Sequence, residues 1–171
     1  MHDILCALAF LAEPPSIIHT DCKPENVLQS TDGVWKLADF GTAFFEGKTP
    51  HTTIVQPEAF RAPESWTYNP TSGVGLTTAI DVWSTGRIFH EIFIRRHIST
   101  QLGSDFLSPP KREAFMTELS AACRHLPVEV QVQLIEFCRN ALQVNPTLRF
   151  SAAALLETSL FTTPATSSRA T

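Results

Sequence analysis

The chain has 171 residues, 43% of them hydrophobic, and its 13 Lys and Arg against 17 Asp and Glu give a formal charge of −4. This composition excludes wholesale disorder, and the length suits one domain or part of a larger one. The mild acidity, without any run of Lys or Arg, removes the usual electrostatic basis for binding nucleic acid or an anionic membrane.

The start of the chain predicts one helix and one hairpin. Apolar residues at helical spacing over 4–11 indicate a buried amphipathic helix, which Pro14 and Pro15 end. Two short β-prone runs follow, at 26–28 and 34–37. The Asp-Gly pair between them is a strong turn signal, so these runs are predicted to form a small hairpin.

The segment from Gly41 to about Thr78 is rich in Thr, Pro and Gly and shows no sustained period. Such a stretch is long for a loop inside a compact domain, which indicates a functional role. We expect residues 41–61 to be irregular.

The rest of the chain predicts helices. Periodic apolar residues indicate one helix around 79–94 and another after Pro109-Pro110. Pro127 can lie in the first turn of a third helix, and Ser151 is predicted to cap a last short one. Residues 162–171, rich in Thr, Ser and Ala, are expected to form a disordered tail.

Four cysteines are scattered along the chain without the spacing of a zinc site. This usage is typical of reduced thiols in a reducing compartment and argues against zinc binding. The first residues lack a basic leader, and no apolar run approaches the ~18–20 residues that span a bilayer. These features predict a cytoplasmic or nuclear protein.

Five short motifs follow one another along the chain between residues 19 and 149. His19-Thr20-Asp21 is followed, after four further residues, by Asn26, and Asp39-Phe40-Gly41 comes thirteen residues after Asn26. The last three motifs are Ala62-Pro63-Glu64, Asp81-Val82-Trp83-Ser84-Thr85-Gly86 and Asn145-Pro146-Thr147-Leu148-Arg149. Each motif alone has an ordinary structural explanation, but their shared order and spacing do not.

In these motifs the chain resembles the C-terminal lobe of a eukaryotic Ser/Thr protein kinase. The resemblance covers about residues 4–161 and implies a kinase catalytic domain, C-terminal lobe only, over 1–161. The implied fold is mainly α, a helical bundle with one small β-hairpin and a long activation segment. His-Thr-Asp and the run Lys-Pro-Glu-Asn-Val-Leu look most like the SR-protein-kinase branch.

The resemblance implies an ATP-dependent transfer of the γ-phosphate to a hydroxyl of a protein substrate, with Mg²⁺. Asp21 would accept the proton of that hydroxyl, and Lys23 would reach the γ-phosphate. Asn26 and Asp39 would supply the oxygen ligands that Mg²⁺ requires. ATP and Mg²⁺ are therefore the expected cofactors, and proteins are the expected partners.

Six further residues would have structural roles by the same resemblance. His19 and Phe40 would pack in an apolar spine behind the site, and Gly41 completes the magnesium-binding triplet. Glu64 and Arg149 would form an ion pair that anchors the end of the activation segment. Asp81 would accept backbone N–H bonds from the catalytic loop.

Thr20 departs from the family pattern, because Arg stands before the catalytic Asp in many kinases. That Arg pairs with a phosphate on the activation segment, and Thr20 offers no charge. Phosphorylation of Thr49, Thr52 or Thr53 is therefore predicted not to be an obligatory activating step. Cys22, in the same loop, is interpreted as a small, partly buried thiol rather than a reactive one.

The family's ATP site also needs a Gly-rich loop, a β3 Lys and a Glu that pairs with this Lys. None of these is expected here, since only 18 residues precede His19 and none of them is Gly. The sequence therefore predicts half a kinase. One hypothesis is an enzyme that lost its N-terminal lobe by truncation and is inactive alone. The other is a non-catalytic module that binds proteins. In both cases the face that the N-terminal lobe would cover is expected to be exposed and prone to association.

Overall fold

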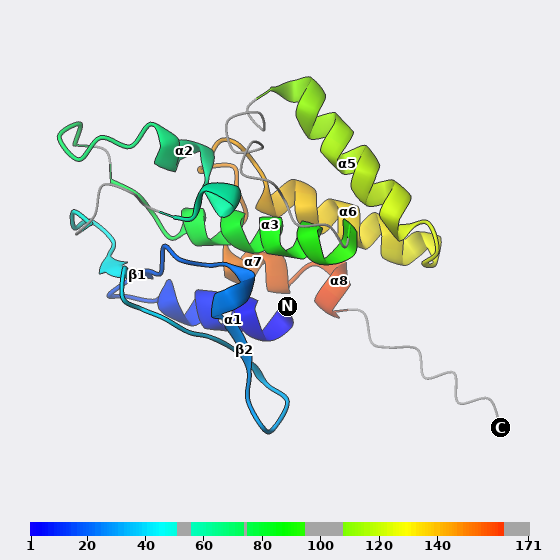
Figure 1. Cartoon of the computed structure of the whole chain (residues 1–171), viewed down its shortest axis with the longest axis horizontal. Coiled ribbons are helices and arrows are strands. Elements are labelled where there is room, and N and C mark those ends of the chain that lie inside the picture. Colours follow the sequence, from blue (N-terminus) through cyan, green and yellow to red (C-terminus); the bar gives the residue numbers. More distant parts are fainter. Residues whose placement is uncertain (51–55, 74, 95–107, 163–171) are drawn as a thin grey trace.

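The computed structural model describes residues 1–50, 56–73, 75–94 and 108–162. Helix α3 (Ala79–Ile94) runs through the centre of the fold, and every residue from Ile80 to His90 is buried. A helix that is covered on all sides belongs to the core. Figure 1 shows α3 between α1 on one side and α5 and α6 on the other. The predicted helix at 79–94 is confirmed with the same bounds.

Helix α1 (His2–Leu11) buries Ile4, Leu5 and Leu8 and ends before the two prolines, as predicted. It packs against α7 (Ala152–Leu156) and against strand β3 (Trp35–Leu37). The Asp3 carboxylate accepts a bond from the Trp35 backbone N–H at 3.0 Å. The N-terminal helix therefore supports the hairpin that carries part of the site.

Helices α5 (Pro109–Cys123) and α6 (Val128–Ala141) follow each other and pack together and against α3. At Gly86, α3 approaches α6 closely, since a Cβ there would lie 2.9 Å from the Ala141 Cβ. Only Gly permits such an approach. Pro127 lies one position earlier than predicted: it is the N-cap of α6, and its carbonyl accepts the Gln131 N–H.

The predicted hairpin is confirmed. Strand β2 (Val27–Gln29) pairs antiparallel with β3, and Val27 lies opposite Leu37. The Ser30 carbonyl accepts the Gly33 N–H, and Gly33 has a φ of +85°, which glycine adopts without strain. Asp-Gly therefore closes the loop as the turn chemistry indicates.

The predicted hairpin is the β2–β3 pair, and the structure adds a second two-stranded ladder to it. Strand β1 (Ile17–Ile18) pairs antiparallel with β4 (Phe44–Phe45), so that Ile17 lies opposite Phe45. Residues 41–61 are also not wholly irregular, since they include β4 and the short 3₁₀ helix η2 (Glu58–Phe60). Strands of two residues whose partner lies far away in the sequence leave no local pattern to detect.

The C-terminal part of the chain has the predicted capped helix and one further short helix. The Ser151 hydroxyl accepts the Ala154 N–H at 3.1 Å, which confirms the predicted cap of α7. A further short helix, α8 (Ser159–Thr162), follows, so α7 is not the last helix. Thr162 is helical, and the rest of the predicted tail lies outside the described residues. Within those residues, no helix combines the length and the apolar character needed to cross a bilayer.

Candidate active site

The predicted catalytic loop, residues 19–23, lies between β1 and the short 3₁₀ helix η1 (Pro24–Asn26), and Asp81 of α3 holds its backbone. One Asp81 carboxylate oxygen accepts the His19 N–H at 2.7 Å, and the other accepts the Thr20 N–H at 2.9 Å. Thr20 has a φ of +70°, which is unfavourable for a β-branched residue. The two bonds therefore hold a strained turn in place.

Asp81 itself is 1% exposed. Burial raises the pKa of its carboxyl to about 6, although the bonds from His19 and Thr20 oppose the shift. The buried Cys22 thiol lies nearby, and its own pKa is raised well above the usual value by burial and by the Asp81 charge. Cys22 is thus fully rather than partly buried and has the properties of an inert thiol.

His19 connects the catalytic loop to the Asp-Phe-Gly segment. Its Nδ1 accepts the Asp21 N–H at 3.2 Å, so in the neutral ring Nε2 carries the proton and donates to the Ala38 carbonyl at 3.0 Å. Burial lowers the pKa of His19, which favours this neutral form. The ring also meets Phe40 edge to face, with centroids 4.7 Å apart.

Asp21, Lys23 and Asn26 form one hydrogen-bonded cluster. The Asp21 Oδ2 accepts bonds from Lys23 Nζ at 2.8 Å and from Asn26 Nδ2 at 2.7 Å. Asn26 Nδ2 also donates to the Asp21 carbonyl at 2.8 Å. The bond to Asp21 raises the pKa of Lys23, so Lys23 is a cation at neutral pH. Proline at the first position of η1 fixes the turn that returns Asn26 to Asp21.

The base of the hairpin brings Asp39 toward this cluster. The Asn26 carbonyl accepts the Ala38 N–H at 2.9 Å, one residue before Asp39. Asp39 has a φ of +62°, and its Oδ1 accepts the Gly41 N–H at 3.1 Å. Among the described residues, no three His, Cys, Asp or Glu side chains gather in a way that could hold a metal unaided.

Phe40 only partly matches the expected apolar spine. It packs on His19, but 47% of the residue remains exposed. His19, by contrast, is completely buried.

Thr20, which stands where many kinases have Arg, bonds to the residue after the Asp-Phe-Gly triplet. Its hydroxyl lies 2.8 Å from the Thr42 hydroxyl and donates toward the Thr42 carbonyl at 3.2 Å. This neutral contact joins the predicted catalytic loop to the segment after Asp-Phe-Gly. An Arg at position 20 would instead bring a positive charge there.

Glu64, at the start of α2 (Pro63–Trp66), pairs with Arg149 at the other end of the chain. The two hydrogen bonds, from Nη1 and Nη2, measure 2.6 and 2.9 Å. The remaining donors of Arg149 reach the carbonyls of Ala79 and Gln143. The Arg149 side chain is completely buried, and that of Glu64 is 19% exposed.

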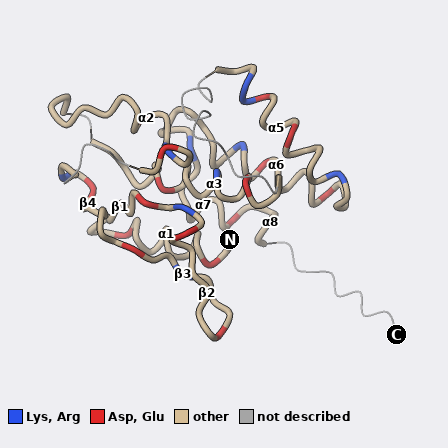
Figure 2. The backbone as a smooth tube through the Cα atoms, in the orientation of Figure 1, with Lys and Arg blue, Asp and Glu red and all other residues tan. Residues whose placement is uncertain are grey.

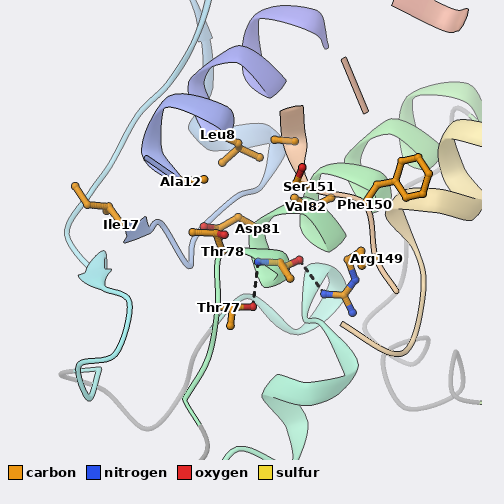
Figure 3. Close-up of a pocket in the computed structure, with 12 residues that line it drawn as sticks. Leu8, Ala12, Ile17, Thr77, Thr78, Asp81, Val82, Arg149, Phe150 and Ser151 are labelled. Atoms are coloured by element: carbon orange, nitrogen blue, oxygen red, sulfur yellow. Dashed lines mark hydrogen bonds between the residues drawn. The ribbon is translucent and has the colours of Figure 1, made fainter. Parts of the chain in front are cut away.

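A cavity of about 120 Å³ lies between α1 and the start of α3. Asp81 and Arg149 lie on its wall, together with Leu8 and Ala12 of α1 and Ser151 (Figure 3). The start of α3 forms one side, where the Ala79 carbonyl accepts from Arg149. Asp81 and the Glu64–Arg149 ion pair therefore lie in one region of the fold.

Gln56 is a residue that sequence reasoning missed. It is 4% exposed and has a φ of +75°. Its amide NH₂ donates to the Ile80 carbonyl at 2.8 Å and to the Ser84 hydroxyl at 2.6 Å, while Oε1 accepts the Ala62 N–H at 2.9 Å and the Ser65 hydroxyl at 2.8 Å.

The Gln56 carbonyl also accepts two bonds from Arg61, at 2.9 and 3.2 Å. Gln56 thus fastens the segment before α2 onto α3. A single Gln in a segment rich in Thr and Pro carries no signal that could have indicated this role.

Comparison with known proteins agrees with these motifs. The protein kinase domain model matches residues 1–161. The Serine/threonine-protein kinase Kist of Mus musculus is 40% identical over 98 residues, which cover 53% of this chain and 23% of Kist. The Cyclin-dependent kinase 4 homolog of Caenorhabditis elegans is 31% identical over 176 residues, covering 90% of this chain and 41% of that protein.

Protein kinase wis1 of Schizosaccharomyces pombe is 32% identical over 152 residues, covering 85% of this chain and 24% of wis1. The chain thus spans less than half the length of these relatives. The family model covers nearly all of the chain, and the matched residues include the hydrogen-bonded loop around Asp21 and Asp81. The chain belongs to the protein kinase domain family.

Proposed function

We propose that this chain carries the catalytic-loop and metal-binding side of an ATP-dependent Ser/Thr protein kinase. The observation that supports this best is the cluster in which Asp21 accepts bonds from both Lys23 and Asn26, beside Asp39. A carboxylate, a lysine and two oxygen ligands are the groups that phosphoryl transfer requires. The four candidate residues come from the catalytic loop and the base of the hairpin.

Asp21 is the candidate base. Both side-chain bonds that it accepts within the described residues use Oδ2, so Oδ1 can accept the proton of a substrate hydroxyl. Asn26 orients the carboxylate by binding its side chain and its own carbonyl. Such a positioned base contributes about 10²–10⁴-fold in rate.

Lys23 would place a positive charge next to the transferred phosphate. The Lys23 Nζ lies 2.8 Å from the Asp21 carboxylate. The cation would therefore be close to the phosphate while Asp21 accepts the proton of the attacking hydroxyl.

The donor set fits Mg²⁺ bound together with a nucleotide. Asn26 uses only Nδ2 in its bonds to Asp21, which leaves its amide oxygen as a ligand, and Asp39 contributes a carboxylate from an exposed position. Two protein oxygens are typical for Mg²⁺, which takes its other ligands from phosphates and water. When bound, Mg²⁺ neutralises the phosphate charge that develops during transfer.

We further infer that residues 1–161 correspond to the C-terminal lobe and that ATP-dependent transfer needs an additional ATP-binding lobe. The sequence has no Gly-rich loop of the G-x-G-x-x-G type, which in this family covers the phosphates. Phe40 and Phe45 line one surface pocket and are 47% and 49% exposed, which favours association of this face with another protein part. Membership of the SR-protein-kinase-like branch stays a prediction that rests on the His-Thr-Asp and Lys-Pro-Glu-Asn-Val-Leu residues.

The metal-binding half of the proposal can be tested in the isolated chain. Mn²⁺ with ADP should broaden the NMR signals of residues 26 and 39 selectively, and Asp39→Ala should remove the effect. An unchanged spectrum at saturating Mn²⁺ and ADP would contradict the assignment of these two residues. Asp32→Ala, on the loop of the hairpin, is the matched control and should leave the broadening as in the native chain.

The isolated chain should show negligible kinase activity with Mg-ATP and a basic protein substrate. Positioning provides most of the catalysis in this reaction, and the loss of one preorganised donor costs about 10²–10³ in the rate of a well-studied hydrolase. Phosphate transfer clearly above that of an Asp39→Ala chain would refute the need for a further lobe. If the chain binds protein substrates but never transfers phosphate in any longer form, the alternative of a non-catalytic binding module is favoured.

A further inference from the structure

Helices α5 and α6 enclose a surface groove of about 460 Å³ that phosphoryl transfer does not use. Met116 from α5 and Ile135 from α6 provide its apolar part. Figure 1 shows this helix pair on the side of the molecule away from the β2–β3 hairpin. A segment bound in the groove would therefore leave the catalytic loop accessible.

The charged residues of the groove are arranged around this apolar part. Arg124 follows the end of α5, Arg139 lies in the last turn of α6, and Glu113 is the one carboxylate among the described lining residues. Both arginines are exposed, and neither takes part in an ion pair within the described part of the chain. Figure 2 shows one basic segment at the turn that joins the two helices, with an acidic segment beside it. The lining thus has a net positive charge.

The groove extends along α6 for a length that fits a short peptide. Gln131, which also lines the groove, lies eight residues before Arg139, or about 12 Å along a helix that rises ~1.5 Å per residue. About four residues of extended chain cover the same length at ~3.3 Å each.

The apolar surface continues beside the groove on α6. Val128 and Val132, one helical turn apart, are 73% and 57% exposed, and Ile135 follows at the next turn. Isolated exposed apolar residues are ordinary, but here two of them extend an apolar floor along one helix.

We propose that this groove binds a short acidic segment of a partner protein. Apolar side chains of the segment pack on Met116 and Ile135, and carboxylates on either side of them approach Arg124 and Arg139. Charge complementarity favours an acidic occupant, because two arginines that form no ion pair within the described residues line the groove and Glu113 is the one carboxylate among its described lining residues. This binding goes beyond the proposed transfer reaction and does not depend on it.

The test uses the whole chain and a fluorescein-labelled peptide, Gly-Glu-Glu-Leu-Leu-Glu-Glu-Gly, with binding followed by fluorescence anisotropy. Saturable binding is expected, and it should weaken at high salt because exposed charges are screened. Two further peptides separate the contributions. Replacing both Leu by Ser tests the apolar part, and replacing every Glu by Lys tests the sign of the charge. Each replacement should weaken binding at least ten-fold.

Protein variants then locate the site. R124E/R139E should weaken binding at least ten-fold, whereas K36E/K48E, which changes the net charge equally at exposed positions on and near the strands, should stay within two-fold of the native chain. Circular dichroism melting curves should match for both variants. The proposal is overturned if the native chain does not bind, if the Ser or Lys peptide binds as well, or if both double variants weaken binding equally. Because no nucleotide or transfer step is involved, these outcomes are independent of those for the proposed kinase activity.

Discussion

The Arg149 guanidinium and the Glu64 carboxylate meet through two parallel hydrogen bonds, 2.6 and 2.9 Å long, although the residues are 85 positions apart in the sequence. Arg149 also bonds the carbonyls of Ala79 and Gln143 and lies over the Trp83 ring, with its central carbon 5.0 Å from the ring centroid. All five of its N–H groups therefore have partners. Bidentate geometry of this kind is the strong form of an ion pair.

Glu64→Ala should destabilise the chain by about 3–5 kcal/mol, because it leaves the buried Arg149 charge without its counterion. That loss is a large share of a typical stability of about 5–15 kcal/mol. Urea unfolding followed by circular dichroism measures it. Glu136→Ala, an exposed residue on α6, is the control and should change stability little. An unchanged midpoint for Glu64→Ala would mean that the pair contributes nothing to folding.

Asp81 should make stability depend on pH in a defined direction. Burial raises its folded pKa from 3.8 to about 6, so the folded chain holds this proton more tightly than the unfolded chain does. Its contribution is therefore largest below pH 3.8 and decreases as the pH rises toward about 6.

Asp81→Asn should remove this pH dependence. It should also lower the free energy of unfolding by about 1–3 kcal/mol at low pH, because the Asn NH₂ group cannot accept one of the two N–H bonds from the loop. Unfolding free energies of both chains at several pH values between 4 and 7 give the comparison. If the difference between them does not shrink as the pH rises, the assigned direction is wrong.

Gln56 allows side-chain bonding and backbone strain to be separated. Gln56→Ala and Gln56→Gly both remove the four side-chain bonds, and each buried group left without a partner costs about 1–3 kcal/mol. At a φ of +75° Gly is unstrained and Ala is not. The Gly variant should therefore be the more stable of the two by roughly 1 kcal/mol in denaturant unfolding. An Ala variant as stable as Gly would show that the backbone relaxes there.

The thiols should differ sharply in reactivity. Cys6 is exposed, whereas Cys22, Cys123 and Cys138 are buried and have raised pKa values because of that burial. At pH 8 a disulfide reagent should label one thiol rapidly in the folded chain and all four in denaturant. Cys6→Ser should abolish the rapid phase, and its persistence would place a second thiol at the surface.

Activation-segment phosphorylation should not be obligatory for activity. Thr20 bonds to Thr42 and offers no cation to a phosphate. In a longer form that includes the ATP-binding lobe, Ala at Thr49, Thr52 and Thr53 together should leave kinase activity largely intact, as measured by phosphate transfer. Thr52 and Thr53 lie outside the described residues, so this remains a prediction from the sequence and Thr20. Loss of activity in a folded triple variant would overturn it.

The sequence by itself determined the features whose signals are local. Apolar periodicity predicted the helix at 79–94, Asp-Gly predicted the hairpin, and Ser151 predicted the cap of α7, because each depends on interactions within a few residues. The site residues could also be chosen in advance, since the spacing of Asp21, Asn26 and Asp39 is a property of the chain.

Only the tertiary structure decided how distant segments meet. The β1–β4 ladder, the Thr20 bond to Thr42 and the bonds of Gln56 to α3 join residues at least 22 positions apart. Their energy comes from burial and from the satisfaction of polar groups that burial would otherwise leave unpaired. A two-residue strand or a single Gln carries no pattern that names its partner, so these contacts exist only once the helices have packed around α3.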